Sequence, residues 1–132
     1  MTQLINDAGF VADDLTQEFT PLGEVANDIK AIDVPADADP ESIPLNAGVI
    51  RVAFGSSADG RGFTIARMLR LRGFEGRLRA YGQVLADQYA MARRSGFDEV
   101  EIPDDLAARQ PQDQWLFRAD WKEHNYQARL RG

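Results

Sequence analysis

A glycine-rich segment with charged residues is the part of the sequence best suited to chemistry. Asp59, Gly60, Arg61 and Gly62 follow an apolar run and lead into a stretch of helical periodicity that also carries Arg67. The first N–H groups of a helix have no internal partners and carry partial positive charge, and glycine lets a ligand approach the backbone closely. The segment therefore predicts an anion-binding site formed by these five residues.

Three strand-then-helix units are expected to position this segment. Residues 49–54, 77–81 and 98–102 have the apolar, β-rich character of strands, and helices are predicted up to about residue 72, over 84–95 and from 103–105 onward. Strands joined by helices run parallel with right-handed crossovers. The predicted fold is α/β, with a small three-stranded parallel βαβαβα core that is half-barrel-like or flavodoxin-like. A β-hairpin is predicted over residues 4–11.

The loops after the predicted strands supply further candidates, because ligands of parallel α/β sheets bind beyond the carboxyl ends of the strands. Gly82 and Gln83 follow the second strand, and Arg79 on that strand is placed to reach the same layer. Asp59 and Asp104 are the candidate catalytic bases of such a rim. A purely structural alternative also stands, in which Asp59 caps the helix and Arg61 covers an apolar edge.

The net charge of −6 conceals a segregation of charge along the chain. Residues 1–48 sum to −9, residues 49–97 to +6 and residues 98–132 to −3, and every base in the middle segment is an arginine. Guanidinium groups bind phosphate, sulfate or carboxylate through two parallel hydrogen bonds. Two interpretations follow: the arginines bind an anion or a partner protein, or the acidic flanks fold over them and neutralise them.

Composition and length limit the remaining function classes. The 132 residues fit one domain, with a hairpin and an acidic, proline-rich linker over 1–47 and the βα core with an aromatic C-terminal segment over 48–132. The chain has no Cys and one His, His124, so no metal site is expected. Nucleic acid is disfavoured as a partner by the acidic charge. Without a signal segment or a membrane-spanning run, a cytoplasmic location is expected.

Three blocks of the sequence, residues 59–70, 76–88 and 93–98, resemble the signature of an uncharacterised bacterial family, domain of unknown function 934. Family members are commonly encoded beside sulfite or nitrite reductase and sulfonucleotide reductase, and are often labelled oxidoreductases without a demonstrated reaction. The resemblance implies a place in sulfur assimilation, and so in cysteine biosynthesis. The family often carries aspartate where this chain has Gln83.

Two functions from different classes are consistent with these observations. The first is an accessory protein of assimilatory sulfite reduction, whose Arg-rich rim binds an anionic intermediate or the reductase. The second is a small oxidoreductase or lyase-like enzyme acting on a sulfur-containing or phosphorylated metabolite. A nicotinamide or flavin site is disfavoured because Gly60 and Gly62 are followed by Ile65, where a dinucleotide fingerprint needs glycine. Exposed sheet edges also predict self-association.

Overall fold

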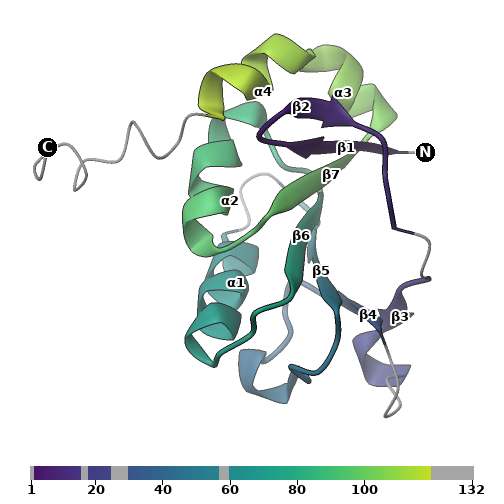
Figure 1. Ribbon diagram of the computed structural model, residues 1–132, viewed down its shortest axis with the longest axis vertical. Helices are drawn as coiled ribbons and strands as arrows, with labels where there is room; N and C mark the ends of the chain where they lie inside the picture. The colour runs from purple at the N-terminus through teal and green to yellow at the C-terminus, as the bar shows by residue number, and fades with distance from the viewer. Residues whose placement is uncertain (1, 16–17, 25–29, 57–59, 120–132) are drawn as a thin grey trace, which may run out of the picture.

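A single seven-stranded sheet organises the chain, in the order β2-β1-β7-β6-β5-β4-β3. The computed structural model describes residues 2–15, 18–24, 30–56 and 60–119. Five neighbouring strands run parallel: β3 (Thr20–Pro21), β4 (Ala31–Val34), β5 (Val49–Phe54), β6 (Arg77–Gly82) and β7 (Glu99–Pro103). β1 (Thr2–Asn6) is antiparallel to β7, and β2 (Gly9–Val11) completes the hairpin with β1. Figure 1 shows the arrangement.

The α/β class and the N-terminal hairpin are confirmed, but the three-stranded core is not, because the sheet is larger. The three predicted strands are β5, β6 and β7, and two short strands from the acidic N-terminal part extend them. The parallel strands follow one another in chain order without reversal. This is the order of a singly wound sheet, whereas a flavodoxin-like sheet reverses direction at a switch point.

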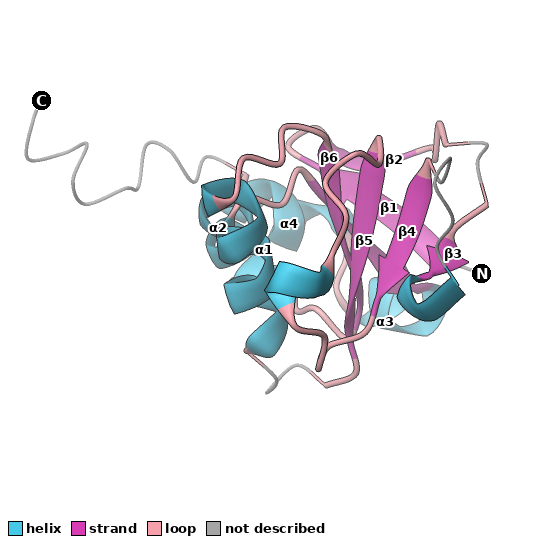
Figure 2. Cartoon of the chain, turned by 90° about the horizontal axis from the view of Figure 1, so that it is seen from below, coloured by secondary structure: helices cyan, strands magenta, loops and turns pink. Residues whose placement is uncertain are grey.

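Helices α1 (Arg61–Leu71), α2 (Tyr89–Ser95) and α4 (Gln112–Arg118) lie on one side of the sheet, and α3 (Asp104–Arg109) follows β7 (Figure 2). Three short 3-10 helices complete the structure: η1 (Leu22–Glu24), η2 (Pro40–Ser42) and η3 (Ala86–Gln88). The helix predicted over residues 84–95 is therefore split into η3 and α2. The Gln88 side chain accepts a hydrogen bond from the Leu85 N–H at 2.9 Å, which closes the 3-10 turn before α2 begins.

The two faces of the sheet differ in chemistry, because side chains alternate along each strand. Even-numbered positions of β5 to β7 face the helices and form the apolar core, including Ile50, Leu78 and Val100, which are completely buried. Most odd-numbered positions of these strands carry polar groups on the opposite face, and the charged ones are Arg51, Arg77, Arg79, Glu99 and Glu101. The strands are thus apolar toward the helices and polar toward the other side.

The acidic, proline-rich linker predicted within residues 1–47 packs against the core where it spans residues 34–44. It contains η2, and the side chain of Ile43 is only 1% exposed. Arg72, just after α1, donates hydrogen bonds to the backbone carbonyls of Pro40 and Ile43 at 2.6 and 2.8 Å. The linker is therefore held to the end of α1 as an ordered crossover between β4 and β5.

The connection from β2 to β3 crosses the polar face of the sheet, because these two strands lie at opposite edges. Residues 12–15 of this connection are called the strap below. Asp13 and Asp14 of the strap contact arginines on β6, and Phe19 beyond it contacts an arginine on β5. The N-terminal part of the chain therefore covers the centre of the face opposite the helices.

The final aromatic segment is partly described. Trp115 on α4 is buried, lies edge-on to the Tyr89 ring with 6.1 Å between centroids, and donates to the Gln110 carbonyl at 2.9 Å. Trp115 thus packs onto the domain, whereas Phe117 is 71% exposed. Trp121, His124 and Tyr126 lie outside the described residues.

Candidate functional site

The predicted anion-binding segment lies at the start of α1. Gly60 precedes the helix with its backbone in helical conformation, and Arg61 is the first helical residue; both are exposed. Arg67 is exposed further along α1. Asp59, the candidate base and capping residue, lies outside the described residues. Three of the five residues of the predicted site, Gly60, Arg61 and Arg67, are therefore exposed to solvent.

Two glycines of the predicted site have packing roles at Phe54, the last residue of β5. A Cβ on Gly62 would lie 2.7 Å from Cε1 of the Phe54 ring, so glycine allows α1 to approach the strand. Gly82 has a φ of +119°, and a Cβ there would collide with the Phe54 carbonyl oxygen. Gln83 is exposed, and its backbone N–H donates to that carbonyl at 2.8 Å. The first two predicted loops thus meet at Phe54.

The other two candidates are placed elsewhere. Asp104 is exposed in the first turn of α3, in the connection that leaves β7 beside β1. Arg79 is fully buried in the middle of β6, and its side chain points to the polar face. The sequence predicts that Arg79 reaches the layer of the loops that follow the strands. Because side chains alternate along β6, the Arg79 side chain instead projects from the face opposite α1.

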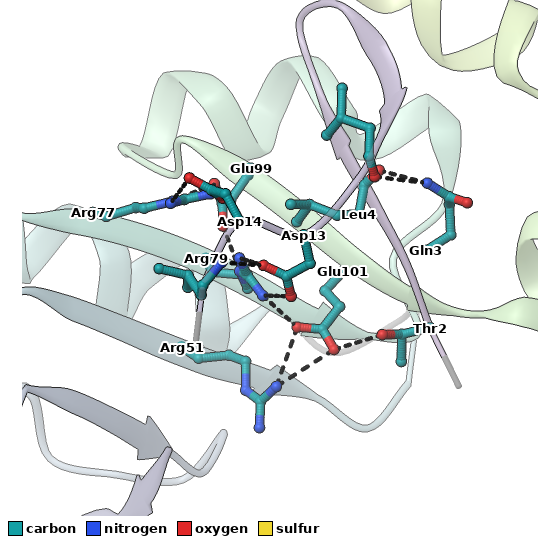
Figure 3. A network of polar contacts seen from close by, with 12 residues as sticks. Thr2, Gln3, Leu4, Asp13, Asp14, Arg51, Arg77, Arg79, Glu99 and Glu101 are labelled. Atoms are coloured by element: carbon teal, nitrogen blue, oxygen red, sulfur yellow. Dashed lines mark hydrogen bonds and ion pairs between the residues drawn. The ribbon is translucent and has the colours of Figure 1, made fainter. Parts of the chain in front are cut away.

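A network of ion pairs occupies the polar face around Arg79 (Figure 3). It joins side chains from β4 to β7 with the strap and contains three guanidinium groups and five carboxyl groups: Arg51, Arg77, Arg79, Asp13, Asp14, Asp33, Glu99 and Glu101. The carboxyl groups come from the acidic flanks of the chain. For these three arginines the structure supports the second interpretation, neutralisation by the flanks.

Arg79 has the most partners in this network. It donates through Nε to Glu99, through Nη1 to Glu101 at 2.8 Å, and through both Nη atoms to Asp13. Burial opposes the charged form, but the hydrogen bonds with Asp13 and Glu101 outweigh it, so the pKa of Arg79 lies above its ordinary value. Its charge is fixed and its donors are largely engaged, so an anion reaching Arg79 must displace a carboxylate.

Arg51 links the network to β4 and to two aromatic rings. Its Nε and Nη2 donate to the two oxygens of Asp33 at 2.5 and 2.8 Å. Its guanidinium carbon lies 4.0 Å from the ring centroid of Phe19 and 4.4 Å from that of Tyr81. Guanidinium groups stack favourably on aromatic faces, especially where water is excluded.

An open groove adjoins this network at the carboxyl ends of β4, β5 and β6. Its cavity has a volume of about 500 Å³. The walls are mainly apolar and include Leu22, Val34, Pro35, Ala53 and Tyr81, with Asp33 at the polar end. Ligand sites in parallel sheets lie at this end of the strands, and concave apolar surfaces with few polar groups bind ligands or partners.

The sequence contains signals for the network that the loop-centred prediction did not use. Arg77, Arg79 and Tyr81 alternate with apolar residues on one strand, and Glu99 and Glu101 alternate in the same way on a neighbouring strand. Alternation with opposite charges on adjacent strands indicates a charged sheet face. The groove had no comparable signal, because β3 and η1 form one of its walls and are very short.

The described part of the chain contains neither a metal-binding cluster nor a membrane-spanning helix. Among residues 2–15, 18–24, 30–56 and 60–119, no group of three or more His, Cys, Asp or Glu side chains is arranged to hold a metal ion. No helix within these same ranges combines the length and apolar character needed to cross a membrane.

Comparison with known proteins identifies the family. A family model described as "Bacterial protein of unknown function (DUF934)" matches residues 23–132, which include β4 to β7 and most residues of the groove and of the network. The comparisons with curated proteins and with solved structures each found no match. Since the family model covers most of the sequence, this chain belongs to the DUF934 family of bacterial proteins.

Proposed function

We propose that this protein is an accessory protein of assimilatory sulfite reduction that docks through the groove onto its reductase. The observation that carries the proposal is the open, apolar groove at the carboxyl ends of β4 to β6. An enzyme that works alone needs an enclosed pocket with titratable groups tuned to the reaction, whereas a docking surface is exposed and apolar. The groove has the second character.

The resemblance to the family supplies the class of partner. Genes of the family commonly accompany those of sulfite or nitrite reductase and of sulfonucleotide reductase, so these enzymes are the proposed partners. The loops at Phe54 supply a second contact. We infer that exposed Gly60, Arg61 and the side chain of Gln83 contact an anionic intermediate beside the docked reductase, and their exposure near the start of α1 supports this contact.

Docking is tested by measuring the affinity of the purified chain for each purified reductase by biolayer interferometry. Ala53 lies in the groove wall, so Ala53→Arg places a long charged side chain where the partner would pack. We expect it to weaken binding at least about tenfold, as expected for a residue central to an interface. Ala108→Arg, at an exposed position on α3, adds the same charge outside the groove and should leave binding unchanged. Equal binding by both variants, or no binding by the wild type, would contradict the proposal.

The anion contact is tested separately by thermal shift with sulfite, sulfate, nitrite, phosphate and adenylylated sulfate. A ligand of the native state at a hundredfold excess over its dissociation constant stabilises by about 2.7 kcal/mol. Stabilisation by one compound that is lost in Arg61→Ala and retained in Arg67→Ala would place the anion at the start of α1. Turnover of that compound by the chain alone would favour the stand-alone enzyme over the accessory protein.

A further inference from the structure

Two arginines on β6 are held in position from within the sheet. The Nε of Arg77 donates to one oxygen of Glu99 at 2.6 Å, and the Nε of Arg79 donates to the other oxygen of the same carboxylate. Glu101 also accepts a hydrogen bond from Arg79 at 2.8 Å. These contacts come from β7 alone, so both guanidinium groups are oriented without help from the strap (Figure 3).

The outer ends of both guanidinium groups bind carboxylates of the strap in the same two-pronged manner. Arg77 donates from Nη1 and Nη2 to the two oxygens of Asp14 at 3.0 and 2.7 Å. Arg79 donates from Nη1 and Nη2 to the two oxygens of Asp13 at 2.9 and 3.0 Å. Arg–carboxylate pairs with this geometry are among the strong and specific polar contacts of proteins.

The strap is the exposed partner in these contacts. The side chains of Asp13 and Asp14 are 43% and 69% exposed, whereas Arg79 is fully buried beneath them. A carboxylate from another molecule can approach from solvent along the direction that the strap carboxylates already occupy. The strap itself belongs to no helix or strand, so its release breaks no β-ladder.

We propose that Arg77 and Arg79 form a binding site for an acidic peptide segment with two neighbouring carboxylates, and that the strap occupies this site until such a segment displaces it. The two positions lie on the same face of β6, about 7 Å apart at the rise of a strand. Asp13 and Asp14 show that adjacent acidic residues span this separation. The site is distinct from the groove and does not depend on the proposed docking of a reductase.

The charges around the site favour a paired ligand over a single anion. Glu99 and Glu101 remain on the sheet when the strap leaves and offset much of the charge of the arginines. A single carboxylate makes one two-pronged contact, with Arg77 or Arg79, and is repelled by Glu99 and Glu101. Two linked carboxylates make both two-pronged contacts at once. Linkage makes the second contact intramolecular, with an effective concentration of about millimolar for a short connection.

The strap is covalently part of the chain, so its carboxylates also act at a high effective concentration. A peptide from another molecule must compete with them for Arg77 and Arg79. A binding site that is mostly occupied shows an apparent affinity reduced by the fraction of molecules in which it is open. Removing the strap carboxylates therefore raises the affinity for an added acidic peptide. Weaker but measurable binding of the same peptide to the wild type separates a displaceable strap from a permanent brace.

The test uses the full chain with Asp13→Asn and Asp14→Asn together, and a blocked peptide with the sequence of residues 11–15, Val-Ala-Asp-Asp-Leu. Binding is followed by NMR through the Nε–H signals of the arginines. We expect the peptide to bind the double variant at least about tenfold more tightly than the wild type. The matched Val-Ala-Asn-Asn-Leu peptide should not bind, and adding Arg77→Gln to the double variant should weaken binding.

Three results would overturn the proposal. If the Asp-Asp peptide binds the double variant no better than the wild type, Arg77 and Arg79 form no site for an acidic segment. If it binds the double variant but leaves the wild-type signals unchanged at the highest peptide concentration, the strap is a permanent brace. If sodium sulfate at equal ionic strength moves the same signals and displaces the peptide, the site binds single anions. Should the double variant fail to fold, Asp14→Asn alone opens the contact at Arg77, and the same peptide comparison applies. No reductase is present, so the result is independent of the docking experiment.

Discussion

The guanidinium carbon of Arg51 lies 4.0 Å from the centroid of the Phe19 ring, so a residue from the β2–β3 connection covers a cation on β5. Half-buried Phe19 shields the pairs that Arg51 makes with Asp33 and Glu101. Phe19→Ala removes this stacking and buried apolar area, and should lower the free energy of unfolding by about 1–3 kcal/mol in urea titrations. The same change at exposed Phe117 should stay within about 0.5 kcal/mol. Equal losses at both sites would show that Phe19 is not part of the packed face.

Substitution by alanine should affect stability very differently at Gly82 and at Gly60. Gly82→Ala forces a side chain into a φ of +119° and against the Phe54 carbonyl, and should destabilise the protein by more than about 2 kcal/mol. Gly60→Ala meets no atom within 4 Å and has a φ of −86°, so stability should change by less than about 1 kcal/mol. Thermal unfolding of both variants measures the contrast, and a loss at Gly60 comparable to that at Gly82 would contradict it.

Arg79 balances buried carboxylates, so its removal should be costly. Arg79→Met leaves Glu99 and Glu101 buried with fewer partners, and we expect a loss of about 3–5 kcal/mol in the free energy of unfolding. Arg67→Met makes the same change at an exposed position of α1 and should cost less than about 0.5 kcal/mol. A neutral or stabilising result for Arg79→Met in urea titrations would show that the network repacks without its central cation.

The strap should make stability depend on pH in acid. The hydrogen bonds from Arg79 to Asp13 and from Arg77 to Asp14 hold the pKa of each carboxyl below its ordinary value of 3.8. Their contribution is complete above that value and is lost as the pH falls through the lowered pKa of the folded state, because the unfolded chain binds protons first.

Urea titrations of the wild type and of Asp13→Asn with Asp14→Asn, over about pH 6 to 2, measure this contribution. The wild type should lose more stability on acidification than the double variant, so the difference between them shrinks below pH 3.8. A difference that stays constant down to the lowest pH would show that the strap carboxylates titrate alike in both states.

Local patterns in the sequence predict the central elements of the fold. The apolar run before the glycine-rich turn predicts β5. The spacing of Ile65, Met68 and Leu69 predicts α1, and Gly73, which has a positive φ, follows the end of this helix. Long-range pairing is not local information. β3 and β4 have two and four residues, too few for periodicity, and nothing near β1 specifies its antiparallel pairing with β7.

The candidate site follows the same division. The glycine-rich turn predicts that a ligand approaches the backbone at Gly62, whereas in the structure the Phe54 ring lies there. The contacts of Arg79 depend on the face of β6 from which its side chain projects. Strand alternation shows which residues share a face, but it identifies the face of Arg79 only when the face covered by helices is known. The sequence does not predict that the strap covers Arg77 and Arg79. Asp13 and Asp14 lie in a segment without periodicity, far along the chain from these arginines.

The hydroxyl of Thr2 donates to the carboxylate of Glu101 at 2.8 Å, across a separation of 99 residues, and the two strands that carry them pair along their length. During synthesis the N-terminal hairpin therefore leaves the ribosome long before the strand that it must join. Until translation has passed β7, β1 and β2 form a lone two-stranded unit, which is marginal in water, and an open β-edge invites pairing with other chains. The parallel strands β3 to β6 can pair as they emerge, whereas β1, although synthesised before all of them, can join the sheet only after β7 has emerged.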